Sequence, residues 1–219
     1  MNSKSFFLTV LCALIVSFSG YTQSKEELDK LMDEAFVALE SNAPNVTEKA
    51  NALLEAGKEA KLPIYQINAY TILGIVNKNK GYYVTSVDYY NNALKVAEET
   101  RDEGRISACY NNIGSVHQIQ EDYAKALTYY KKSLELEEKL NNPLQKSIRL
   151  YNIGEIYREM DSLSLALSNF NNSLIIEKEY KNNEGIVYAL LGISDVYLQL
   201  NRPTDASISL GEAKKIFTE

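Results

Sequence analysis

Residue types that carry chemistry are scarce in this sequence. Its 219 residues include one histidine, two cysteines and no tryptophan. A structural zinc site, an iron–sulfur cluster and a disulfide framework each need more ligands than these, so all three are excluded. Four prolines and ten glycines also provide too few turns for a fold of many strands, which needs one about every 8–12 residues. The composition therefore favours a mostly helical protein.

Basic residues are too few for a nucleic-acid-binding protein. The chain has 23 Lys and Arg against 29 Asp and Glu, a formal net charge of −6. Binding of nucleic-acid phosphates needs a positively charged surface, and the net negative charge of this chain does not favour one. Its 16 tyrosines and paired asparagines could form a stacking platform for single strands, but basic residues do not accompany them. We expect no nucleic-acid partner.

A long apolar run lies near the N-terminus. Lys4 precedes the run from Phe6 to Phe18, and small and polar residues follow it, which is the order of a secretory signal. This run is too short for a membrane-spanning helix, which needs about 20 residues. We predict a signal peptide over residues 1–22, with cleavage after Ser19 or Thr22, and export to the periplasm or beyond. The alternative is an uncleaved anchor, and only then would the mature chain be inserted in a membrane.

The rest of the sequence is built from repeated units, each about 40 residues long. Large residues recur in register at Tyr90, Tyr130, Phe170 and Leu210. Small residues recur in three series, namely Gly74, Gly114, Gly154 and Ser194; Ser86, Ala126, Ala166 and Ala206; and Ala93, Ser133, Ser173 and Ala213. Apolar residues within a unit follow helical spacing, so each unit is predicted to be a pair of helices in which large residues pack over small ones.

Turn and proline positions agree with this division. Gly81, Glu121, Asp161 and Asn201 stand in register at the turn inside each pair, and three of them suit a left-handed helix end. All four prolines, at positions 44, 63, 143 and 203, fall at or near expected helix starts. The sequence predicts one domain over residues 23–219, with repeats at about 25–60, 63–100, 103–140, 143–180 and 183–219.

One unit carries a recognisable pattern. Tyr110-x-x-Ile113-Gly114-x-x-His117, followed by Ala126-x-x-x-Tyr130-x-x-Ser133, resembles the tetratricopeptide repeat in its longer variety of about 40 residues. The resemblance implies an all-α, right-handed superhelical solenoid of about five helix-turn-helix repeats. It also implies that the first helix of each repeat lines a groove that binds a protein or peptide.

The positions that resemble groove-lining residues have mixed chemistry. They are Asn68, Thr71, Lys78, Asn111, Ser115, Gln118, Tyr151, Glu155, Arg158, Tyr188 and Asp195. Amide, hydroxyl and aromatic side chains suit an extended peptide or a partner helix. Tyr151 and Arg158 are expected to contribute most, because Tyr and Arg often dominate binding energy. The alternative is that these residues form only a solvated polar face.

Other residues that could carry chemistry favour structural roles. His117 takes the place of Tyr157 one period later, so we expect it to pack, and Cys109 is interpreted as a small, semi-buried hydrophobe. Carboxylate pairs such as Glu137 and Glu138 are typical of a solvated helix surface. No P-loop, dinucleotide-binding or hydrolase motif occurs. We therefore expect no enzymatic activity, no cofactor and no metal.

The leading hypothesis is an exported, non-enzymatic solenoid that binds a protein or peptide. It resembles the sensory modules of some bacterial regulators. A structural adaptor of an envelope or secretion assembly is the alternative. The last predicted helix, Pro203 to Glu219, carries Ile208 and Leu210, so we expect either further chain in the natural product or self-association through this helix.

Overall fold

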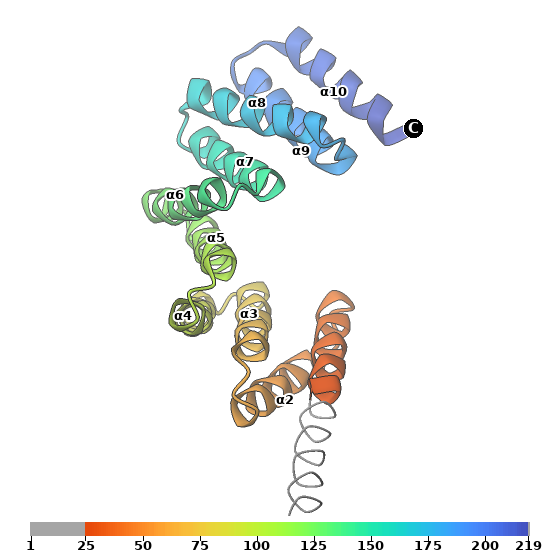
Figure 1. Ribbon diagram of the computed structural model, residues 1–219. Helices are drawn as coiled ribbons and strands as arrows, with labels where there is room; N and C mark the ends of the chain where they lie inside the picture. Colours follow the sequence, from red (N-terminus) through yellow and green to blue (C-terminus); the bar gives the residue numbers. More distant parts are fainter. Residues whose placement is uncertain (1–24, 219) are drawn as a thin grey trace, which may run out of the picture. The chain divides into compact units, whose positions relative to one another are not determined.

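A computed structural model describes residues 25–218, so the predicted signal peptide lies outside the described residues. Helices and short connections make up this described part, which contains no strand. The helices are a segment over residues 25–40, α2 (Val46–Glu59), α3 (Pro63–Asn79), α4 (Tyr83–Glu99), α5 (Glu103–Ile119), α6 (Tyr123–Lys139), α7 (Pro143–Glu159), α8 (Leu163–Glu179), α9 (Asn183–Gln199) and α10 (Pro203–Thr218) (Figure 1). The expected all-α repeat solenoid is confirmed. None of the described helices has both the length and the apolar character to cross a membrane.

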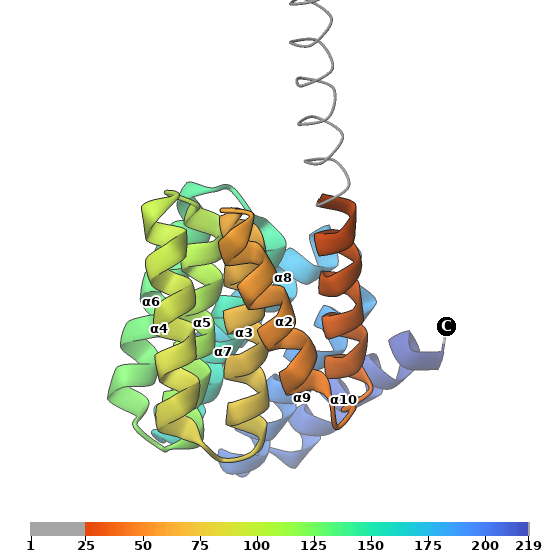
Figure 2. The ribbon, with the colours of Figure 1, turned by 90° about the horizontal axis from the view of Figure 1, so that it is seen from below.

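The chain divides into two compact units, Met1–Val96 and Ala97–Glu219, with the boundary inside α4. In the first unit α2 packs against α3. In the second unit each helix from α5 to α10 contacts the next one along the chain, and α7 also contacts α9 (Figure 1). Figure 2 shows the same helices seen from below. Contacts between neighbours in sequence are what a repeat architecture requires.

The central repeats divide into two helices of equal length. Helices α3 to α9 each have 17 residues and begin at evenly spaced positions, namely 63, 83, 103, 123, 143, 163 and 183. One residue of each connection has a left-handed backbone, with φ between 50° and 80°, at Asn42, Lys61, Gly81, Arg101, Glu121, Asn141, Asp161, Lys181 and Asn201. The following N–H then bonds back to the helix, as Asp122 N does to His117 O at 2.9 Å. The sequence predicted the turns within repeats, and the structure shows the same turn between repeats.

Helix starts are fixed by side chains as well. Asp102, Asp122, Asn142 and Asn182 each accept a hydrogen bond from the backbone N–H of the third residue after them. Such caps satisfy donors that have no partner within the helix. Pro63, Pro143 and Pro203 are the first residues of α3, α7 and α10, as predicted.

The predicted packing of large on small residues is confirmed. A Cβ added to Gly154 would lie 2.7 Å from Cε1 of Phe170, and one added to Gly114 would lie 2.9 Å from Cδ1 of Tyr130. These glycines let the two helices of a repeat approach closely. Leu210 differs from the other large residues because it is 43% exposed, and no described helix follows α10 to cover it.

The expected structural roles of His117 and Cys109 are also confirmed. The His117 ring stacks on Tyr129 with centroids 5.6 Å apart, and burial lowers its pKa. Cys109 is buried, and burial raises the pKa of its thiol to about 12. The Cys109 thiol is therefore un-ionised near neutral pH.

Candidate functional site

The predicted groove residues of the first unit lie on α3. Asn68, Thr71 and Lys78 are all partly buried. The Asn68 amide nitrogen lies 2.9 Å from the sulfur of Met32, and burial lowers the pKa of Lys78. These side chains are therefore partly engaged in the packing of their own unit.

The predicted groove residues on α5 take part in hydrogen bonds within the protein. Asn152 on α7 donates its amide N–H to Asn111 Oδ1 at 2.9 Å. The Ser115 hydroxyl donates to the carbonyl of Asn112 in its own helix, and the Tyr130 hydroxyl donates to Gln118 Oε1 at 2.7 Å. A ligand would have to share or replace these bonds, so α5 offers few open polar groups.

Charged groups at the C-terminal end of α7 pair with one another. Arg158 Nη2 lies 3.0 Å from Glu155 Oε2 and 2.7 Å from Glu159 Oε1. The hydrogen bond from Arg158 to Glu155 is the main reason that the pKa of Arg158 is raised. Asp195 on α9 is exposed. Arg158 is thus already neutralised, which weakens its predicted role as an anchor.

Two of the predicted residues come together on adjacent first helices. The rings of Tyr151 on α7 and Tyr188 on α9 meet edge to face with centroids 6.3 Å apart. Tyr151 also packs on Phe170, with centroids 5.3 Å apart, and burial raises its pKa to about 12. Tyr188 is 52% exposed. Tyr151 is therefore more of a core residue than the sequence indicated, while Tyr188 is open to a ligand.

A cavity of about 350 Å³ lies beside these two tyrosines, between α7, α8 and α9. Its walls include Tyr151, Ser173, Glu177, Glu184, Gly185 and Tyr188. Glu184 is exposed, whereas Glu177 is only 3% exposed. The cavity thus has aromatic walls and a buried carboxylate.

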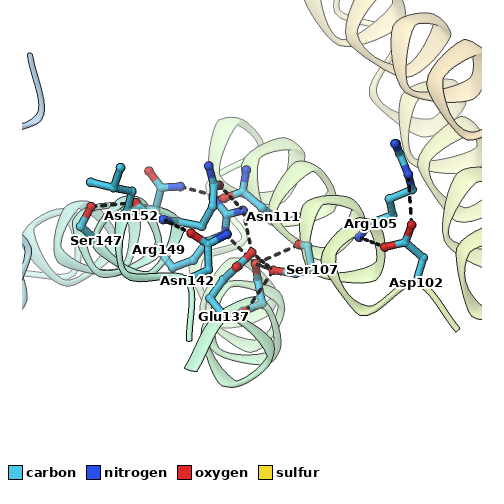
Figure 3. A network of polar contacts seen from close by, with 12 residues as sticks. Asp102, Arg105, Ser107, Asn111, Glu137, Asn142, Ser147, Arg149 and Asn152 are labelled. Atoms are coloured by element: carbon cyan, nitrogen blue, oxygen red, sulfur yellow. Dashed lines mark hydrogen bonds and ion pairs between the residues drawn. The ribbon is translucent and has the colours of Figure 1, made fainter. Parts of the chain in front are cut away.

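Glu137 corrects the interpretation of its carboxylate pair as a solvated surface, because the residue is only 2% exposed. Figure 3 shows it in a polar network with Ser107 and Arg149. The Ser107 hydroxyl donates to Glu137 Oε1 at 2.5 Å, and Arg149 Nη2 lies 3.4 Å from the same oxygen. Burial lowers the pKa of Arg149, and the charge of Glu137 opposes that shift. The two residues form a buried ion pair between adjacent repeats.

Glu177 is the functional candidate that the sequence interpretation missed. It stands one period after Glu137, and its Oε1 accepts a hydrogen bond from the Ser147 hydroxyl. Oε2 has no hydrogen-bond partner among the described residues. The sequence spacing could have indicated that both glutamates are buried. Ser133 and Ser173 stand one helical turn before them, which places the glutamates on the same buried face of their helices.

The site offers acceptors and aromatic faces. In the described part of the chain, no group of three His, Cys, Asp or Glu side chains could hold a metal ion. A buried carboxylate beside tyrosines can bind a cationic group, through charge and through the aromatic faces.

Comparisons with known proteins agree with the repeat pattern. The tetratricopeptide repeat family model matches residues 65–139. The comparison with curated protein sequences finds no match.

Several solved structures share the fold. Tetratricopeptide-like repeats of a putative kinesin light chain from Podosopora anserina have a TM-score of 0.68 at 10% identity, over 87% of this chain and 94% of that one. A Rap protein complexed with competence and sporulation factor has a TM-score of 0.69 at 14% identity, over 98% and 73%. A signal transduction ATPase with numerous domains and a tetratricopeptide repeat sensor, from Pyrococcus horikoshii, has a TM-score of 0.75 at 19% identity, over 90% of this chain and 30% of that one.

The helical repeats and these similarities define the class of protein. Its helices pair into hairpins with the small and large positions of the tetratricopeptide pattern, and the family model matches two successive repeats. Residues 65–139 match the tetratricopeptide repeat family, and the described chain has the fold of tetratricopeptide-repeat proteins.

Proposed function

We propose that this chain is a non-enzymatic module that binds a peptide, or an extended segment of a protein, along α7 and α9. The observation that carries the proposal is the cavity of about 350 Å³ bordered by Tyr151 and Tyr188. Tyrosines at a partly buried site supply contact area at low conformational cost, and a nearby polar group fixes orientation. A peptide is favoured over a small molecule because the cavity opens onto exposed side chains of two helices, including Ile148 and Tyr188.

We further propose that binding serves sensing or interaction in a bacterial regulatory system outside the cytoplasm. The signal-like sequence of residues 1–22 motivates the location. Among proteins of the same fold, one is a Rap protein complexed with competence and sporulation factor, and another has a tetratricopeptide repeat sensor. Both similarities concern the fold alone, and they motivate the regulatory role that we propose.

A selection from a random heptapeptide library tests the proposal. We expect the full chain to enrich peptides that bind it, and Tyr188→Ala to weaken their binding by about 1–3 kcal/mol, because this exposed ring borders the cavity. Tyr82→Ala is the matched control, since Tyr82 is 61% exposed and lies in the other unit. Enrichment of no peptide, or equal losses in the two variants, would refute the proposed site.

A further inference from the structure

Glu137 and Glu177 occupy equivalent positions in successive repeats, and their surroundings differ in one respect. Both are almost completely buried, at 2% and 3% exposed. Each accepts a hydrogen bond from a serine of the preceding helix, Ser107 for Glu137 and Ser147 for Glu177. In the described residues, Oε2 of both glutamates lacks a hydrogen-bond partner. Among the described residues, Glu137 forms an ion pair with an arginine, whereas Glu177 forms none.

That cation comes from the following repeat. Arg149 on α7 places Nη2 3.4 Å from Glu137 Oε1 and donates from Nε to Ser133 Oγ at 2.7 Å. Its Nη2 also donates to Gln145 Oε1 at 3.1 Å. One period later, the residues at the positions of Gln145 and Arg149 are Gly185 and Ala189. Both side chains that would cover Glu177 are therefore absent from α9.

The cavity lies beside Glu177, where side chains equivalent to Gln145 and Arg149 are absent. Glu177, Gly185 and Ser173 line it, and Ser173 is the equivalent of the serine that Arg149 contacts. Glu184 adds a second carboxylate, and no lysine or arginine is among the described residues around the cavity. A buried carboxylate without a cation costs free energy, so a positively charged ligand group would be stabilised here.

Gly185 lets the Glu177 carboxylate pack closely against α9 beside the cavity. A Cβ at this position would lie 2.3 Å from Cδ and 2.4 Å from Oε2 of Glu177. Any larger residue would have to displace the Glu177 side chain, and its own side chain would enter the space beside the carboxylate. The glycine thus lets Oε2 lie against α9 at the edge of the cavity, where it is buried and has no hydrogen-bond partner among the described residues.

We infer that this cavity binds the guanidinium group of an arginine side chain in the peptide ligand. The inference rests on the proposed function, since it names the side chain that the same site recognises. The ligand guanidinium takes the place that Arg149 holds one repeat earlier, and pairs with Glu177 and Ser173. Its several N–H donors can serve both residues, and its flat face can stack on Tyr151 or Tyr188, whereas an ammonium group offers a compact point charge.

The test uses the full chain and synthetic heptapeptide libraries labelled with fluorescein. In each library one position is fixed as arginine, lysine or citrulline, and the other positions are randomised. Citrulline has the shape of arginine without its charge. Fluorescence anisotropy should show that arginine at one position binds at least tenfold more tightly than citrulline or lysine there.

Three variants locate the effect. Glu177→Gln keeps the size and an acceptor for Ser147 but removes the charge, so the preference for arginine should disappear. Glu179→Gln is the matched control, because Glu179 is exposed on the same helix, and the preference should remain. Ala189→Arg supplies an internal arginine at the position of Arg149, and should reduce binding of the arginine library to the level of the citrulline library.

The outcomes separate this inference from the proposed function. A preference for arginine that survives Glu177→Gln would overturn the inference, and equal binding of lysine would overturn the assignment to guanidinium. If the libraries bind without any preference for arginine and lose binding in Tyr188→Ala, the inference fails while the proposed function stands. If no library binds, both fail.

Discussion

The same residue type, at equivalent positions in two repeats, takes opposite roles in this protein. Glu137 neutralises Arg149, and the two buried charges depend on each other. Glu177 has no such partner among the described residues. Removing one member of a buried ion pair leaves an uncompensated charge, whereas removing an isolated buried charge relieves a cost.

The two glutamates should therefore respond differently to neutralisation. Glu137→Gln should lower the free energy of unfolding by about 3 kcal/mol, because Arg149 would remain buried without a counter-charge. Glu177→Gln should leave it unchanged or raise it. Urea denaturation followed by circular dichroism measures both. A loss of similar size in the two variants would show that Glu177 is paired within the folded chain.

Cys109 should be inert while the protein is folded. Burial raises its pKa to about 12, above the ordinary value of about 8.5, so at pH 8 the reactive thiolate is a very minor species. Mass spectrometry of the Cys109 fragment after iodoacetamide treatment should find little alkylation at pH 8 and complete alkylation in urea. Rapid alkylation of the folded chain would mean that the thiol is exposed.

At the scale of the helix, stability depends on close approach at the small positions. Gly154→Ala should cost about 1–3 kcal/mol, because the new Cβ would lie 2.7 Å from Phe170 Cε1. Gly211 on α10 is a matched control, since a Cβ there meets nothing within 4 Å. Gly211→Ala should stabilise the protein by about 0.5–1 kcal/mol through helix propensity. Thermal melts compare the two, and equal shifts would contradict the proposed helix packing.

Much of the helix packing and many of the helix boundaries could be predicted from the sequence. The period placed Gly154 against Phe170, and prolines marked three helix starts, because backbone turns and packing contacts recur in every repeat. Leu210 departs from the pattern because covering it needs a helix after α10, which lies beyond the repeat itself.

The candidate site was harder to predict. The family pattern led to Tyr151 and Tyr188, which the structure brings together. It could not indicate whether Glu177 is paired, because that depends on residue 189, which belongs to another helix and reaches the carboxylate only in the folded protein. The pairing of Arg158 with Glu155, by contrast, could have been predicted, because residues three apart are neighbours on a helix surface.

At the scale of the whole molecule, export remains a prediction. If the signal peptide is cleaved, intact-mass measurement should find a mature chain that begins at Gly20 or Gln23, in the fraction outside the cytoplasm. A chain that keeps residues 1–22 and stays with the membrane would favour the anchor instead.

The central claim is that a peptide binds the second unit at α7 and α9. Hydrogen–deuterium exchange of the full chain, with and without an arginine-containing peptide from the fixed-position libraries, tests it most directly. We expect the added protection to concentrate in Pro143–Glu159 and Asn183–Gln199, with little change in α2 or α3. Protection confined to α2 and α3, or absent from both α7 and α9 at a saturating concentration of peptide, would contradict the account.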